Sequence, residues 1–394
     1  MTTTDITSPA SKEPARAQSD QRAVLDQVRE FARSEVDPIV ESSEAAGQIP
    51  ADLKQKFHDM GVPTRFLEAY PGDEFVSTVC LLADELSYHC AAIASHLLLP
   101  IFFNRVVLGL LDGEARQQFL QRCLDGPVIT SFAASESAAG SDLMSLSVTA
   151  QRTDSGYVLN GRKEYSSNLR SAQYVIVVAR TGPADDRSTD AMTWFLVPTD
   201  APGLTIGERW PTFGLKAIDV SPMELKDVEV PAAYRLGAEG RGLPMMGTSL
   251  SMSRTGIAAL GVGISRRARD VVLEHSKRRR IYGAKLNRMQ DYRFRIADME
   301  KNIAAARALV AVSAAKADRG EDAVKEASIA KLFSGELVMN ITAAASAMLG
   351  SIGYTGQSPI EKLMRDGRHV AIVEGPEPTH KELIFAHLLR HGGY

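Results

Sequence analysis

Hydrophobic periodicity changes twice along this 394-residue chain, and these changes constrain its fold more than any other feature. From Ser19 to about Asp125, apolar residues recur at the spacing of one helix face. From about Val128 to Leu236, short apolar segments alternate with turn residues, which is typical of β-strands. Helical spacing then returns, as in the set Ile296, Met299, Ile303, Ala306 and Val310. The sequence therefore predicts a mainly α protein with a central β domain.

The same changes divide the chain into four segments. Residues 1–18 are rich in Thr, Ser, Ala and Pro and lack an apolar core, so we expect a disordered tail. We expect an N-terminal helical domain over residues 19–127, a middle β domain over 128–236 and a C-terminal antiparallel helical bundle over 237–394. One bundle helix is expected from about Thr255 to Lys277. Within the β domain, Asn160-Gly161 is expected to form a turn after the strand segment that ends at Leu159.

The charge balance excludes two classes of partner. The 45 basic and 48 acidic residues give a net charge of −3, so no strong field favours nucleic acid or an anionic membrane. The apolar run from Ala91 to Leu111 contains His96, Pro100, Asn104 and Arg105. These residues predict a buried helix pair rather than a membrane span.

Cysteine usage indicates the compartment. The three cysteines, Cys80, Cys90 and Cys123, are an odd number without CxxC spacing. This pattern argues against a disulfide framework and against a zinc site, and no other metal site is expected. The N-terminal segment also lacks the apolar stretch of a signal peptide. We therefore expect a cytoplasmic protein.

One carboxylate, Glu374, lies where the chain must leave a helix. Gly375 and Pro376 oppose continuation of the helix, and Pro378 suits the first turn of the next one. A carboxylate on such a bend can point into a cavity, which is the geometry that a proton-abstracting base needs. The alternative is that Glu374 only meets the dipole at a nearby helix N-terminus.

Two motifs lie in the β region. Residues 132–142 read FAASESAAGSD, where small residues and hydroxyls allow backbone amides to approach a ring edge or a pyrophosphate. Residues 160–168 read NGRKEYSSN, in which Tyr165 supplies an aromatic ring and Ser167 a hydroxyl. Without further context, the first motif also suits an ordinary polar loop. The second also suits a hairpin turn with a half-buried tyrosine.

Two further motifs lie in the C-terminal region. Residues 279–283 read RRIYG and are followed by Gln290. The planar guanidinium group of Arg279 suits the binding of a diphosphate. Alternatively, the three consecutive arginines at 278–280 suit the solvent-exposed C-terminal end of a helix. The fourth motif runs from LGSIGY at residues 349–354 through EKLMRD at 361–366 to Glu374-Gly375.

Together, these four motifs resemble those of the acyl-CoA dehydrogenase family over roughly residues 20 to 385. The resemblance implies an N-terminal helical domain, a middle β-barrel and a C-terminal four-helix bundle. It also implies FAD bound between the domains and a neighbouring subunit, in a homodimer or homotetramer.

The resemblance carries specific roles onto this chain. Glu374 matches the catalytic base, Ser135 and Tyr165 lie beside the flavin ring, and Arg279 reaches the FAD diphosphate of another subunit. Ser141, Arg254 and Gly375 are expected to contact the substrate. The full set of residues expected to bind FAD is Phe132, Ser135, Ser141, Tyr165, Ser167, Arg279, Tyr282, Gln290, Leu349, Gly350 and Pro376.

The implied reaction is α,β-dehydrogenation of an acyl thioester to the 2,3-enoyl thioester. Glu374 would remove the weakly acidic α-proton, FAD would accept the β-hydrogen as hydride, and burial should raise the pKa of Glu374. Ser251 stands where certain family members carry an Asp that recognises the adenine of CoA. The thioester could therefore be carried by CoA or by a carrier protein. The electron acceptor would be a flavoprotein or oxygen.

Two alternatives belong to other functional classes. Flavin-dependent monooxygenases and nitroalkane oxidases are similar to this family, but the monooxygenases do not use the glutamate base. The chain could also be a flavin-free helical interaction protein, which flavin absorbance of the purified protein would test.

Overall fold

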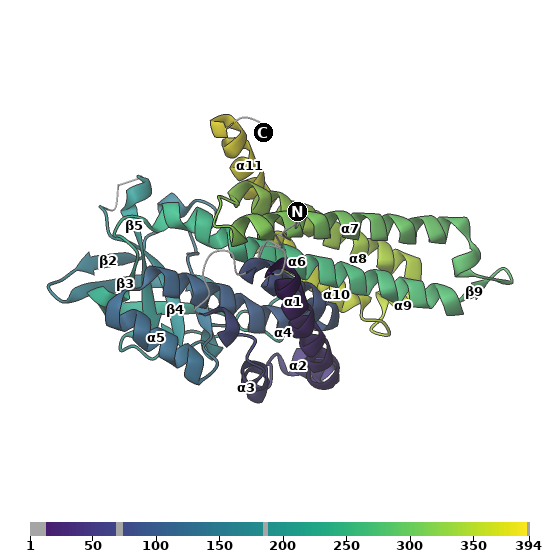
Figure 1. The fold of residues 1–394 in the computed structure, drawn as a ribbon, viewed down its shortest axis with the longest axis horizontal. Helices are drawn as coiled ribbons and strands as arrows, with labels where there is room; N and C mark the ends of the chain where they lie inside the picture. Colours follow the sequence, from purple (N-terminus) through teal and green to yellow (C-terminus); the bar gives the residue numbers. More distant parts are fainter. Residues whose placement is uncertain (1–12, 68–73, 184–187, 392–394) are drawn as a thin grey trace, which may run out of the picture.

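The computed structural model describes residues 13–67, 74–183 and 188–391 (Figure 1). The helix α1 begins inside the segment 1–18, which the sequence predicted as a disordered tail; residues 1–12 of that segment lie outside the described residues. The N-terminal helices are α1 (Glu13–Phe31), α2 (Val40–Ala46), α3 (Ala51–Asp59), α4 (Phe75–Leu110) and α5 (Gly113–Asp125).

The long helix α4 forms the centre of the N-terminal region. Cys90 has non-helical dihedral angles (φ −155°, ψ 111°), so two helical segments meet there. The predicted helix pair within Ala91–Leu111 is therefore wrong, because a single helical segment follows Cys90 and Pro100 is accommodated inside it. By length and composition, α4 and α8 (Val324–Leu349) could each cross a membrane, but 89% of the apolar window of α4 is buried inside the protein. This burial is typical of a core helix.

The described part of the middle region forms one eight-stranded sheet. Its order is β6-β7-β3-β2-β4-β5-β8, and β1 pairs in parallel with β4. The strands are β1 (Thr130–Ala133), β2 (Thr149–Arg152), β3 (Gly156–Ser167), β4 (Tyr174–Arg180), β5 (Met192–Pro198), β6 (Leu204–Ile206), β7 (Val220–Pro231) and β8 (Arg235–Leu236).

Strand β3 corrects one prediction. Asn160-Gly161 does not end a strand, because β3 continues through it with a shift of register against β7. Gly161 has φ 134°, and the Asn160 side chain bonds across to Asp227, accepting from its backbone N–H at 2.8 Å. Asn160-Gly161 therefore forms a β-bulge. Bulges and turns share such sequences because both use residues that tolerate unusual backbone angles.

The C-terminal region is a helical bundle, so the predicted order of helices, strands and helices is confirmed. Its helices are α6 (Gly242–Arg278), α7 (Gln290–Asp318), α8, α9 (Ser351–Tyr354), α10 (Ile360–Ile372) and α11 (Glu377–His391). Helix α6 begins well before Thr255, where we expected it. A short hairpin, β9 (Arg280–Ile281) and β10 (Ala284–Lys285), lies at the end of the bundle farthest from the sheet (Figure 1).

Close packing between α4 and α6 joins the N-terminal region to the bundle. At Gly263 of α6, an added Cβ would lie 2.0 Å from Ser87 Oγ and 2.2 Å from the carbonyl oxygen of Asp84. Ser87 Oγ also donates to the carbonyl oxygen of Leu260 at 3.0 Å. The absence of a side chain at Gly263 therefore allows the two helix backbones to approach.

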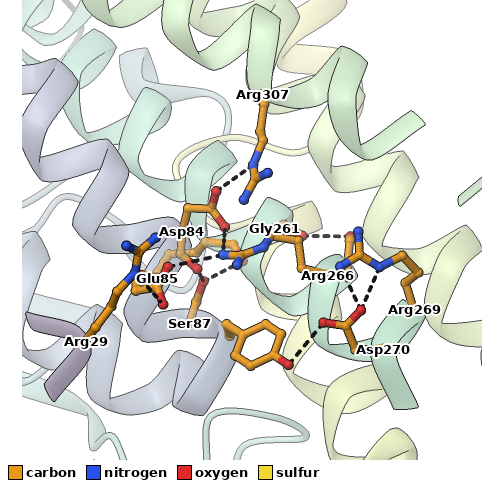
Figure 2. Close-up of polar contacts among 12 residues, drawn as sticks. Arg29, Asp84, Glu85, Ser87, Gly261, Arg266, Arg269, Asp270 and Arg307 are labelled. Carbon is orange, nitrogen blue, oxygen red and sulfur yellow. Dashed lines mark hydrogen bonds and ion pairs between the residues drawn. The ribbon is translucent and has the colours of Figure 1, made fainter. Parts of the chain in front are cut away.

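Charged side chains strengthen the same junction, as Figure 2 shows. Asp84 accepts hydrogen bonds from Arg266 of α6 and Arg307 of α7, both at 2.8 Å. Arg29 of α1 lies 3.4 Å from Glu85, which also faces Arg266 at 3.5 Å. Because opposite charges face each other throughout, we interpret this network as a structural link between four helices.

Candidate active site

A cavity of about 580 Å³ lies where the sheet, α4, α6 and the turn between α10 and α11 meet. The sheet side supplies polar groups, including Ser135, Ser141 and Ser167. The helical side supplies apolar groups, including Leu99 and Phe103 of α4 and Leu250 of α6. Glu374 lines this cavity from the turn. The cavity thus combines apolar side chains with many polar and charged ones, including Arg254 and Arg368 on the helical side.

Glu374 occupies the bend between α10 and α11. It has φ 55°, in the left-handed region that non-glycine residues rarely adopt, and Gly375 follows with φ 118°. Ser253 Oγ of α6 donates a hydrogen bond to Glu374 Oε2 at 2.8 Å. Arg254 Nε donates to the carbonyl oxygen of Glu374 at 3.2 Å. Contacts from α6 therefore help to hold this strained backbone.

Burial raises the pKa of Glu374 to about 7. The hydrogen bond from Ser253 and the positive charges of Arg254 and Lys331 oppose this rise because they favour the carboxylate. A carboxylate with a pKa near neutrality can accept and release a proton under ordinary conditions. The Glu374 carboxyl group is therefore suited to general-base chemistry.

Two further residues fix the turn, and the sequence analysis missed both. Lys331 Nζ of α8 and His380 Nε2 of α11 both hydrogen-bond to the carbonyl oxygen of Gly375, at 3.0 and 2.9 Å. Neither residue belongs to a recognisable motif.

A bulge in β3 shapes the sheet side of the cavity. The register between β3 and β7 shifts between Lys163 and Ser166, and Tyr165 within this bulge has φ 56°. The Tyr165 ring is largely exposed and lies 5.8 Å from the ring of Trp210. The bulge therefore presents an aromatic surface beside the serine hydroxyls.

A buried ion pair supports that wall. Lys163 Nζ donates to Glu136 Oε1 at 2.7 Å and to the carbonyl oxygen of Ala134 at 2.9 Å. Glu136 also accepts hydrogen bonds from the backbone N–H groups of Ser147 and Val148. Both charged residues lie within the motifs at 132–142 and 160–168, but neither was predicted to have a role. They connect the two motifs.

The structure brings together most of the predicted site residues. Those that line the cavity are Phe132, Ser135, Ser141, Tyr165, Ser167, Arg254, Glu374, Gly375 and Pro376. The apolar wall was not predicted, because residues such as Met246 and Phe103 have the same spacing as ordinary core residues.

The other predicted cofactor residues lie elsewhere. Arg279 and Tyr282 belong to the exposed β9–β10 end of the bundle, and Tyr282 is 99% exposed. Gln290 begins α7, and the Tyr292 hydroxyl donates to the carbonyl oxygen of Met348, just before Leu349 and Gly350. These predicted residues thus form a second group, at the opposite end of the bundle from the sheet (Figure 1).

Comparisons with known proteins place this architecture in a family. Residues 18–127 match the model of the acyl-CoA dehydrogenase N-terminal domain, residues 131–228 the middle domain and residues 240–389 the C-terminal domain. The chain is 32% identical to cyclohexane-1-carbonyl-CoA dehydrogenase of Geobacter metallireducens, over 94% of this chain and 97% of that protein.

Solved structures give the same result. Butyryl-CoA dehydrogenase from Megasphaera elsdenii superposes with a TM-score of 0.89 at 28% identity, covering 94% of this chain and 98% of that chain. The prolyl acyl carrier protein oxidase AnaB has a TM-score of 0.83 at 25% identity, covering 94% and 99%. The chain therefore belongs to the acyl-CoA dehydrogenase family.

Proposed function

We propose that this protein is an FAD-dependent dehydrogenase that converts an acyl thioester to its 2,3-enoyl thioester. The observation that supports this most directly is Glu374, a carboxylate with a pKa of about 7 on a bend that lines the cavity. Family membership supports the same reaction, since relatives include cyclohexane-1-carbonyl-CoA and butyryl-CoA dehydrogenases.

The residues present fit FAD. Glu164 Oε2 and Thr212 Oγ1 are buried atoms of cavity-lining residues, and neither has a hydrogen-bond partner among the described residues. A Cβ at Gly140 would meet no atom within 4 Å, so there is space beside this loop. These features suit a large ligand with polar edges. Ser135, Tyr165 and Ser167 would hold its ring system.

Each protein group has a definite part in this reaction. Glu374 accepts the α-proton of the thioester as the α-C–H bond breaks and the new double bond forms. Ser253 orients the carboxylate, and Arg254 holds its backbone. The backbone N–H of Glu374 is assigned to the thioester carbonyl oxygen, where negative charge develops. Bound FAD supplies the acceptor for the hydride that leaves the β-carbon.

A second subunit explains the residues at the far end of the bundle. Arg279 is exposed and lies outside the cavity of its own chain. Guanidinium groups bind diphosphates well, so we assign Arg279, with Tyr282 and Gln290, to the FAD of a neighbouring subunit. Leu349 and Gly350 belong to the same group. The assembly would be a homodimer or a homotetramer.

The acyl group is carried by CoA or by a carrier protein. Ser251 is buried, and its hydroxyl donates to the carbonyl oxygen of Gly247 in its own helix at 2.7 Å. This position therefore offers no acidic group to an adenine. Carriage of the substrate by a protein has a parallel in AnaB, a prolyl acyl carrier protein oxidase. Comparing kcat/KM for one acyl group on the two carriers decides between them.

The remaining partners follow from the same chemistry. Reduced flavin would pass its electrons to an electron-transferring flavoprotein or to oxygen. The described cysteines, Cys80, Cys90 and Cys123, are free and buried, and we propose a cytoplasmic location.

An anaerobic screen tests the function. Purified protein is mixed with acyl-CoA and carrier-bound acyl substrates, and bleaching of the flavin absorbance is followed. Bleaching with formation of the 2,3-enoyl product is expected. If no thioester bleaches the flavin, and NAD(P)H-reduced enzyme instead incorporates oxygen into a substrate, the protein is a monooxygenase.

A further inference from the structure

We propose that Lys331 and His380 are positioning residues that hold the Glu374–Gly375 bend, and that the charge of Lys331 also favours the carboxylate form of Glu374. This inference rests on the proposed role of Glu374 as the base. It concerns residues outside the motifs that define the family resemblance.

The first observation is convergence on one atom. The carbonyl oxygen of Gly375 accepts from Lys331 Nζ at 3.0 Å and from His380 Nε2 at 2.9 Å. Lys331 lies on α8 and His380 on α11, while Ser253 and Arg254 approach the bend from α6. Groups from three helices therefore fix two consecutive residues with left-handed backbone angles. A carbonyl with two donors resists the rotation that would turn Glu374 out of the cavity.

The second observation is the burial of the lysine. Lys331 is only 1% exposed, and burying an ammonium group without compensation is costly. Burial lowers the pKa of Lys331 to about 8. The positive charge of Arg254 also lowers this pKa, whereas the negative charge of Glu374 raises it. The ammonium therefore remains largely protonated at pH 7. Its charge favours the carboxylate form of Glu374.

His380 supplies a hydrogen bond without a charge. It is fully buried, and burial, with the charges of Lys331 and Arg254, lowers its pKa to about 3. The neutral ring must carry its proton on Nε2, because the Gly375 carbonyl can only accept. His369 of α10, which also lines the cavity, has a pKa lowered to about 4 by burial and by Lys331. Among the described residues, the positive charges that lower the pKa of Glu374 are those of Arg254 and Lys331, although Arg365 and Arg368 also line the cavity.

Because Lys331 is charged and His380 is neutral, experiments can separate the electrostatic role of the lysine from the positioning role of the histidine. Removing the lysine charge should change both the position and the ionisation of Glu374. Removing the histidine donor should change its position alone. A residue that only stabilises the fold would alter neither the ionisation of Glu374 nor the pH dependence of flavin reduction.

The experiment compares Lys331→Met and Lys331→Arg with His380→Ala and His380→Gln, all as FAD-loaded, assembled protein. Infrared difference spectra between each protein and its Glu374→Gln variant, recorded across pH without substrate, report the ionisation of Glu374. Stopped-flow flavin reduction gives the pH profile with an acyl substrate that bleaches the wild type. Flavin content and oligomeric state confirm folding, and Lys331→Gln replaces the methionine variant if that one does not assemble.

We expect Lys331→Met to raise the pKa of Glu374. The acid limb of the rate profile, where flavin reduction slows as Glu374 is protonated, should therefore move to higher pH. Lys331→Arg, which keeps the charge, should leave both near their wild-type positions. His380→Ala should lower the pH-independent rate roughly tenfold or more without moving the limb, since a misplaced base loses rate. His380→Gln, which keeps an N–H donor, should restore part of that rate.

If Glu374 titrates at the wild-type pH in Lys331→Met, or in Lys331→Gln where that replaces it, the electrostatic role of Lys331 is overturned. A wild-type rate in His380→Ala would overturn the positioning role of the histidine. These outcomes differ from failure of the proposed function, because the infrared titration needs no turnover and would report Lys331 even if another residue were the base.

Discussion

At the scale of single residues, Glu374 combines three properties that rarely occur together. Its backbone is left-handed, its carboxyl group has a pKa of about 7 raised by burial, and its side chain borders a ligand-sized cavity. A strained residue is retained where the surrounding contacts over-determine it. Here, donors from α6, α8 and α11 provide those contacts.

Removing one donor should change the pH dependence of the reaction. Ser253→Ala deletes the hydrogen bond to Glu374 Oε2, which favours the ionised form, so the pKa of Glu374 should rise. Because only the carboxylate accepts a proton, flavin reduction should slow by about tenfold below pH 7 and recover at higher pH. Stopped-flow absorbance across pH measures this.

The control for that variant is Ser265→Ala. Ser265 is also buried on α6, but its hydroxyl donates to the carbonyl oxygen of Gly261 in its own helix. Its pH profile should match that of the wild type. The same altered pH profile in both variants would contradict a specific role of the Ser253 hydrogen bond.

At the scale of elements, the approach of α6 to α4 determines how the apolar wall of the cavity is placed. Gly263→Ala would put a Cβ 2.0 Å from Ser87 Oγ, so the helices must separate. We expect a loss of roughly 1–3 kcal/mol in the free energy of unfolding, the usual cost of overpacking. Denaturant titration of the variant measures it.

Gly247→Ala is the matched control on the same helix. The nearest atom to a Cβ at Gly247 is Val324 Cγ2 at 3.8 Å, an ordinary contact. This variant should be neutral or more stable, because alanine favours a helix over glycine by up to about 1 kcal/mol. Equal destabilisation of both variants would contradict the steric argument.

The elements also show what could be predicted from the sequence. Periodic apolar residues such as Met299 and Ile303 predicted buried helix faces, which the structure confirms. The start of α6 was missed, because Gly242 and several serines have low helix propensity, and because Pro244 was not recognised as a first-turn proline, whose missing N–H costs no helical hydrogen bond. The Asn160-Gly161 bulge was mistaken for a turn, since both use residues with unusual backbone angles.

The candidate site was predictable where local chemistry is distinctive. Glu374 stood out because Gly375 and Pro376 must break a helix. Lys331 and His380 did not, since a lysine or histidine within a helix usually faces solvent. Only the fold brings them to the Gly375 carbonyl. The contribution that we propose for a second subunit is also invisible in local sequence, apart from the resemblance around Arg279.

At the scale of the whole molecule, the predicted cofactor residues fall into two groups at opposite ends of the bundle. One group lines the cavity beside the sheet, and the other surrounds the β9–β10 hairpin (Figure 1). Arg279 is exposed and is not among the residues that line the cavity of its own chain. The arrangement is explained if each FAD lies between two subunits.

Charge reversal at the hairpin tests this arrangement. Arg279→Glu should repel the FAD diphosphate and weaken FAD binding roughly 10- to 100-fold, the range expected for a charge-assisted hydrogen bond. Flavin-to-protein absorbance ratios and light scattering measure occupancy and assembly. Arg278→Glu, at the adjacent exposed position, should retain FAD. Full occupancy in a folded, assembled Arg279→Glu protein would rule out this contact.

The most direct test of the central claim is the rate of flavin reduction in Glu374→Gln. Glutamine keeps the volume of the side chain but cannot accept the α-proton, so FAD and the oligomeric state should persist. Anaerobic stopped-flow mixing with an acyl thioester should show bleaching slowed by roughly 10²–10⁴-fold, the usual contribution of a positioned general base. A folded, FAD-loaded glutamine variant that is reduced at the wild-type rate would contradict the account.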